Sequence, residues 1–136
     1  MVLSTAIILS SSLCGANKAS ASAAEPAAYN YATALRDSII FYDANKCGKD
    51  AGVDNFFDWR DACHTEDGKD MGYDLTGGYH DCGDHVKFGI TEGYAASVLE
   101  WSYYRYKDTF DKTGNTQKML QQLKHFTDYF LIKMIF

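Results

Sequence analysis

Proline is almost absent from this sequence, with one residue in 136, Pro26. After residue 30 there is also no internal repeat and no low-complexity stretch, so nothing in the composition marks a linker between domains. Basic residues are few as well. Lys and Arg number 13 against 18 Asp and Glu, for a net charge of -5, and the two signs are interspersed along the chain. The sequence therefore lacks the basic stripe that nucleic acid or an anionic membrane requires, and we expect neither as a partner.

Apolar residues are well represented, at 46% of the chain, and aromatic residues make up 15%. This composition is typical of a folded chain and excludes a disordered tail. The length allows about one ordinary globular domain.

The first 23 residues differ in character from the rest. An apolar and small-residue run, residues 2–16, precedes an Ala- and Ser-rich stretch with A-x-A cleavage patterns, although no Lys or Arg stands ahead of the run. The run is shorter than the ~20 residues that a membrane span needs. We predict a secretory signal peptide over residues 1–23 and a mature domain over residues 24–136, with a wrong start codon or a short membrane anchor as alternatives.

Three stretches show the periodicity of amphipathic helices. The first begins at Asn30, a residue suited to the N-cap, and Gly48 is a plausible stop. The second begins at Thr91, and the third follows Gly114. Residues 49–90 between the first two are rich in Gly and Asp without a period, and a loop of that length is usually functional. The last residues, 131–136, are apolar and end without a stop signal, so we expect a truncated domain.

Two carboxylates, Asp81 and Asp84, stand three residues apart after Gly77-Gly78. They can act on one water if the turn brings them together, and glycine permits the backbone angles that such a turn needs. Taken alone, this pattern could equally be a solvated Asp-rich turn.

The surrounding residues resemble the signature of glycoside hydrolase family 9, the inverting endoglucanases, with Cys82 where the family's Gly-Gly-aromatic-x-Asp-Ala-Gly-Asp run has alanine. The resemblance extends over about residues 29–130, including Trp59-Arg60 and the Asp74–Gly78 lead-in. It implies an all-α fold, the N-terminal part of an (α/α)6 barrel. The implied function is hydrolysis of β-1,4-glucosidic bonds in cellulose or another β-1,4-glucan with inversion.

The resemblance also assigns roles to residues. Asp84 would be the general base that activates water, and Asp81 would help to position that water. The general acid would be a glutamate beyond residue 136, so we expect the chain alone to be inactive. Glu92 and Glu100 are interpreted as ordinary helical residues.

Aromatic residues fall into two predicted groups. We expect Tyr79, Trp59 and His85 to contact the sugar, with Phe88 as a further stacking candidate. We expect the residues at helical spacing to be core; they are Trp101, Tyr103, Tyr104 and Tyr106.

Cysteine and histidine form a second candidate site. Cys47, Cys63, His64 and His80 could bind zinc as a closed Cys2His2 set, which would be structural. Some members of the resembled family carry such a site. The alternative is a disulfide between Cys47 and Cys63, which secretion would favour. Either way Cys82 remains, and we interpret it as a buried, inert thiol.

Calcium is common in the resembled family, but residues 66–70 do not match a calcium loop. We interpret that stretch as solvated and identify no calcium site. Two other functions remain open: a non-catalytic carbohydrate-binding fragment and a small zinc-stabilised helical protein with an unrelated interaction role.

Overall fold

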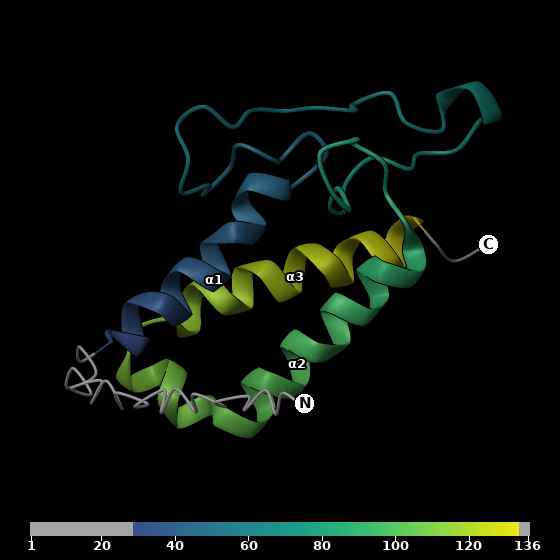
Figure 1. The fold of residues 1–136 in the computed structure, drawn as a ribbon. Coiled ribbons are helices and arrows are strands. Elements are labelled where there is room, and N and C mark those ends of the chain that lie inside the picture. The colour runs from purple at the N-terminus through teal and green to yellow at the C-terminus, as the bar shows by residue number, and fades with distance from the viewer. Residues whose placement is uncertain (1–28, 134–136) are drawn as a thin grey trace, which may run out of the picture.

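The computed structural model describes residues 29–133, so the predicted signal peptide lies outside the described residues. Four helical elements follow one another in these residues: α1 (Tyr31–Asn45), η1 (Lys69–Met71), α2 (Gly89–Lys112) and α3 (Thr116–Lys133). Within the described residues the only extended pairings are two isolated bridges, Lys46 with Tyr79 and Gly48 with Cys63. The fold is helical, as predicted (Figure 1).

The helix ends have local causes. The Asn30 side chain accepts the N–H of Thr33 at 3.0 Å and so caps α1, as expected. This helix stops at Asn45, before the predicted Gly48, because the chain leaves it to pair Lys46 with Tyr79. α2 starts two residues before the predicted Thr91 and is kinked at Tyr106.

The third helix carries the core. α3 contacts both α1 and α2, and two clusters of buried side chains fill these contacts. One contains Ile39, Phe110 and Met119, and the other contains Tyr79, Ala96 and Phe126. Since Tyr79 comes from the long loop, the loop is part of the core.

Residues 46–88 lie across one end of the helices, where α1 ends and α2 begins (Figure 1). Asp43, in the last turn of α1, is fully buried and anchors this region. It forms ion pairs with Lys46 at 3.1 Å and Lys118 at 2.7 Å. It also accepts hydrogen bonds from Gln122 Nε2 at 2.6 Å and from the Phe56 N–H at 2.9 Å.

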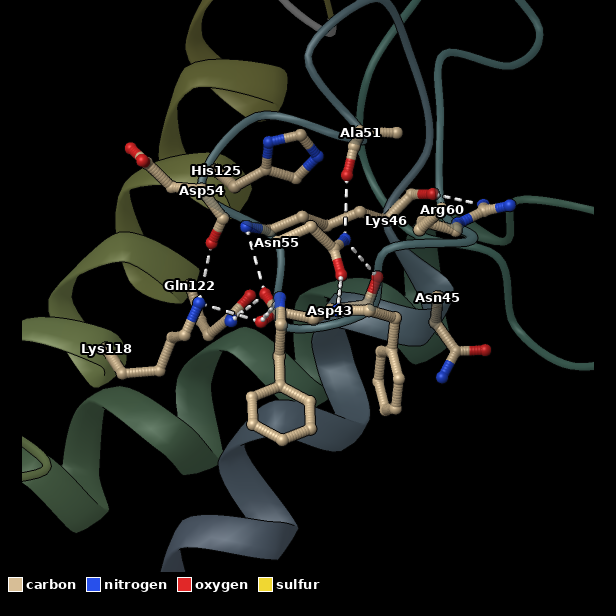
Figure 2. Close-up of polar contacts among 12 residues, drawn as sticks. Asp43, Asn45, Lys46, Ala51, Asp54, Asn55, Arg60, Lys118, Gln122 and His125 are labelled. Atoms are coloured by element: carbon tan, nitrogen blue, oxygen red, sulfur yellow. Dashed lines mark hydrogen bonds and ion pairs between the residues drawn. The ribbon is translucent and has the colours of Figure 1, made fainter.

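Figure 2 shows that the side chains of Gln122 and Lys118 reach Asp43 from α3. Asn55 adds the loop to the same network, because its amide donates to the carbonyl oxygens of Asp43 and Ala51, each at 2.7 Å. The network therefore joins α1, α3 and the start of the long loop.

The predicted core assignment of the aromatic residues on α2 is wrong for three of them. Trp101, Tyr104 and Tyr106 are exposed, whereas Tyr103 packs against the buried cluster of Phe110. The face of α2 that meets α3 is instead Ala96, Leu99, Tyr103 and Phe110. None of the helices in residues 29–133 has the length and apolar character of a membrane span.

Candidate active site and metal centre

A tight turn presents Asp81 and Asp84 to solvent. The Asp81 N–H donates to the Val86 carbonyl at 2.8 Å, and the His85 N–H donates to the Cys82 carbonyl at 3.3 Å. His85 has a φ of 60°, in the left-handed region that closes the turn. Both carboxylates are exposed, so a substrate and a water can reach them.

The environment of Asp84 favours its charged form. Its Oδ1 accepts the Val86 N–H at 3.0 Å, and this hydrogen bond, followed by one from Cys82, lowers the pKa of Asp84 below its ordinary value. Asp84 is therefore a carboxylate at neutral pH, the form that a general base needs.

Asp81 is oriented from α2. The Thr91 hydroxyl donates to Asp81 Oδ1 at 2.5 Å. This bond fixes one carboxylate oxygen; the sequence marked Thr91 only as a helix start and did not predict this role.

Glu92 is not the ordinary helical residue that the sequence suggested. It is 5% exposed, and its Oε1 accepts the Tyr79 N–H at 2.8 Å. Burial raises the pKa of Glu92 to about 7, against smaller opposing effects of that hydrogen bond and of Lys87. The signal that could have found it is its spacing from Ala96 and Leu99, which places all three on the buried face of α2.

The role of Lys87 in holding the segment before the turn was also not predicted from the sequence. Its Nζ donates to the carbonyls of Leu75 at 2.6 Å and Gly77 at 3.2 Å, and forms an ion pair with Asp67 at 2.6 Å. The segment before the turn is thus fixed by a charged side chain just after it. Because Asp67 pairs with Lys87, the interpretation of residues 66–70 as a solvated stretch is wrong at Asp67.

The residues predicted to contact the sugar differ in their exposure to solvent. Trp59 is 66% exposed, and His85 and Phe88 are also exposed, so all three can meet a ligand. Tyr79 is 3% exposed, with its hydroxyl donating to Gln122 Oε1 at 2.7 Å. The expectation for Tyr79 is therefore wrong, because its side chain is enclosed in the core.

The four predicted metal ligands come together. One ligand atom each from Cys47, Cys63, His64 and His80 lies within 4.8 Å of the others. Both cysteines are free thiols, so the alternative disulfide is not formed in this structure. Two thiols and two imidazoles at this spacing fit a tetrahedral metal such as zinc.

The protonation states around this cluster have clear causes. Burial, with the nearby Arg60 guanidinium, lowers the pKa of His80 to about 4, so its imidazole is neutral and able to bind a metal. Burial raises the pKa of the Cys47 thiol to about 12 in the absence of a metal. A bound cation would supply the charge that the Cys47 thiolate requires.

Cys82 departs from expectation. It is an exposed thiol on the turn, not a buried one. Its side chain instead hydrogen-bonds the exposed Asp84 carboxylate on the same turn.

Comparison with known proteins places this arrangement in a family. Residues 31–134 match the sequence model of glycosyl hydrolase family 9. The chain is 48% identical over 103 residues to Endoglucanase 4 of Bacillus sp. (strain KSM-522), covering 76% of this chain and 16% of the relative. It is 42% identical over 118 residues to Endoglucanase A of Bacillus pumilus, covering 87% of this chain and 18% of the relative.

A solved structure agrees with the sequence comparisons. The cellulase Cel9M of C. cellulolyticum superposes with a TM-score of 0.74 and 70% identity, over 76% of this chain and 24% of that one. Cel9M has also been solved in complex with cellobiose. This chain therefore spans about a quarter or less of the length of these relatives.

The helices, their order and the matched residues confirm the predicted fold, part of the (α/α)6 barrel of these enzymes. Because the family match covers residues 31–134, which include α1, α2 and α3, the chain belongs to glycosyl hydrolase family 9.

Proposed function

We propose that this chain supplies the part of an endo-β-1,4-glucanase that carries the general base, and that the enzyme hydrolyses cellulose or a related β-1,4-glucan with inversion. The observation that supports this most directly is the exposed turn with Asp84 held as a carboxylate next to Asp81.

In the proposed reaction Asp84 takes a proton from a water while the water oxygen forms a bond to the anomeric carbon. The glycosidic bond breaks, and a general acid protonates the departing oxygen. Inverting enzymes hold base and acid roughly 6.5 to 9.5 Å apart to leave room for this water. Asp81, oriented by Thr91, would accept a hydrogen bond from the same water.

Glu92 has the raised pKa that suits a general acid, but its geometry excludes the role. Its carboxyl lies beneath Gly78 and Tyr79 and is bound to a backbone N–H, so it does not reach a glycosidic oxygen. We therefore assign the acid to a residue outside the described ones, as the family resemblance implies.

The substrate assignment has two supports. The matched relatives are named endoglucanases, and Cel9M binds cellobiose in its solved complex. In this chain Trp59 offers an exposed ring on which a glucosyl unit can stack, and His85 is next to Asp84. We assign both to substrate binding.

We further propose that the Cys2His2 cluster binds zinc in a structural role. His80 directly precedes Asp81, Cys47 directly precedes Gly48, and Cys63 is the residue that pairs with Gly48, so a metal would join the chain just after α1, the long loop and the turn. Zinc would supply cross-linking only, because four protein ligands leave no position for water. An equimolar zinc content in purified protein would support this, and two missing thiols without zinc would contradict it.

An enzyme acting on an insoluble polymer must meet it outside the cell. We propose that residues 1–23 are the export signal and that residues 24–136 belong to the secreted catalytic domain. N-terminal sequencing of exported protein tests this, with a mature end near residue 24 expected.

The test of the proposed function is a hybrid enzyme in which residues 31–134 of this chain replace the matching segment of Cel9M. The 70% identity makes this exchange conservative. We expect the hybrid to hydrolyse soluble β-1,4-glucan and to release the α-anomer first, observed by proton NMR. Release of the β-anomer first would contradict an inverting mechanism.

The 136-residue chain should be assayed alongside it. We expect no release of reducing sugar, because general acid catalysis typically contributes about 10²- to 10⁴-fold. If the hybrid binds cellooligosaccharides without turnover, the non-catalytic carbohydrate-binding alternative is favoured.

A further inference from the structure

Glu92 lies in the first turn of α2, directly beneath the segment that leads into the candidate catalytic turn. Its Oε1 accepts the N–H of Tyr79, two residues before Asp81. Its other oxygen, Oε2, is buried and has no hydrogen-bond partner. A buried carboxyl with an unused oxygen costs free energy, so its presence calls for a reason.

The neighbouring residue acts on the same segment. Thr91 donates its hydroxyl to Asp81 Oδ1 at 2.5 Å. Two adjacent residues of α2 therefore hold the segment at two points, the backbone of Tyr79 and the side chain of Asp81. Both bonds run from a helix, which is a rigid support for a site.

The backbone closes tightly around the Glu92 carboxyl. Gly78 has a φ of 75°, and a Cβ there would lie 2.6 Å from Glu92 Oε1 and 2.9 Å from the Tyr129 ring. No side chain other than hydrogen fits that position without movement. The Gly-Gly pair before the aspartates thus makes room for Glu92 and Tyr129.

Neither packing nor helix electrostatics alone explains why a carboxyl group is buried at position 92. An apolar side chain would fill the same space at lower cost, and an exposed acid would interact equally with the helix N-terminus. The nearby charge is Lys87, which is already bonded to the carbonyls of Leu75 and Gly77 and paired with Asp67. What Glu92 alone supplies is the acceptor for Tyr79.

We propose that Glu92 is a positioning residue for the hydrolytic reaction: it fixes the backbone at Tyr79 so that the turn carrying Asp81 and Asp84 keeps one orientation. The inference rests on the proposed function, because that function gives the turn its role in the reaction. The physical claim, that Glu92 holds the turn closed, is independent of activity.

The test uses the full 136-residue chain and amide hydrogen exchange measured by NMR at Asp81 and Val86. These N–H groups close the turn, on the Val86 carbonyl and on Asp84 Oδ1. Three substitutions are compared: E92M keeps the volume without the acceptor, E92D keeps the charge without the reach, and E92Q keeps both reach and acceptor. E100Q, at an exposed position on the same helix, is the matched control.

We expect exchange at Asp81 and Val86 to accelerate about tenfold in E92M and E92D, as loss of one buried hydrogen bond allows. E92Q should remain within about threefold of the unmodified chain, and E100Q should be unchanged. If E92M does not fold, E92D and E92Q decide the question by the same criterion. Equal exchange in E92D and E92Q, or no acceleration in any Glu92 variant, would overturn the proposal.

The consequence for the reaction is measured in the hybrid enzyme. There E92D should lower kcat about tenfold or more with little change in KM, because a misplaced turn impairs the chemical step, whereas E92Q should restore most of kcat. An inactive unmodified hybrid would refute the proposed function while the exchange result still decides the role of Glu92. An active hybrid whose kcat E92D leaves unchanged would overturn the positioning role.

Discussion

The carboxyl of Glu92 gives folding an unusual pH dependence. Burial raises its pKa from 4.5 to about 7, so between these values the folded chain keeps a proton that the unfolded chain releases. The contribution of Glu92 to the free energy of unfolding therefore falls as pH rises through this window. Gln cannot ionise, so E92Q should gain stability relative to the unmodified chain as pH rises.

The predicted gain is about 3 kcal/mol between pH about 4 and about 8, from the size of the pKa shift. It is measured as the difference between the two urea unfolding free energies at each pH. Taking this difference removes the opposite effect of His125 and His80, whose lowered pKa values make stability rise with pH. A difference that stays constant across the window would show that Glu92 is not desolvated.

Gly78 provides a second prediction at the residue scale. Gly78 and Gly72 have nearly the same φ, 75° and 77°, but a Cβ at Gly72 would meet nothing within 4 Å. G72A should therefore cost only the left-handed strain, about 1 kcal/mol. G78A should cost about 1–3 kcal/mol more, because it also collides with Glu92 and Tyr129. Equal losses in thermal unfolding would mean that the contact is relieved freely.

Sequence and structure differ most at single residues. The spacing of Asp81 and Asp84 identified the turn, since motif residues adjacent in sequence remain adjacent in space. Tyr79 and Cys82 were misassigned, one as a sugar contact and the other as buried. The burial of Tyr79 depends on α3 and the exposure of Cys82 depends on the turn geometry, neither of which a local pattern contains.

At the scale of elements, Asp43 joins α1, α3 and the loop. Burial opposes its charge, but hydrogen bonds from Lys118, Gln122 and Lys46 outweigh that effect and lower the pKa of Asp43. Its contribution to stability is thus present above its ordinary pKa and is lost as pH falls through the lowered value.

D43N should destabilise the chain by about 3–5 kcal/mol, because it leaves the buried Lys46 ammonium without a negative partner. Asp37 is the matched control, since its ion pair with Arg36 is exposed and D37N should change stability by about 0.5 kcal/mol or less. Urea unfolding of both variants checks this. Similar losses for both would show that the network adds no stability.

The existence and order of the helices were predictable because each carries apolar residues at helical spacing, and the first also has the Asn30 cap. The face of α2 that is buried was not predictable from the sequence. Apolar residues lie all around this helix, so periodicity alone allowed the stripe through Trp101 as readily as the one through Leu99 and Phe110. Contact with α3 decides between them.

For the molecule as a whole, the proposed zinc would link the chain just after α1 to the long loop. Zinc at 100-fold excess over its Kd should raise the free energy of unfolding by about 3 kcal/mol, and a chelator should reverse this. C63S should abolish the response and C82S, outside the cluster, should retain it. Calorimetric unfolding with and without zinc measures the effect, and an unchanged melting temperature in the parent chain would refute a structural metal.

The chain covers a small part of its relatives but a continuous part of the candidate site. It spans 24% of the Cel9M chain, yet it contains the whole turn of Asp81 and Asp84 together with Thr91, Glu92 and Lys87, which hold it. The turn and its supports are therefore close in sequence, and they can be transferred together in a segment exchange.

The role of Asp84 as the base is tested by the turnover of soluble β-1,4-glucan in two hybrid enzymes. One carries D84A, and the control carries D70A, at an exposed aspartate elsewhere in the loop. We expect D84A to lower kcat by about 10²- to 10⁴-fold while cellobiose binding persists, and D70A to stay near the unmodified rate. A D84A enzyme that keeps its kcat would contradict the assignment of Asp84 as the base.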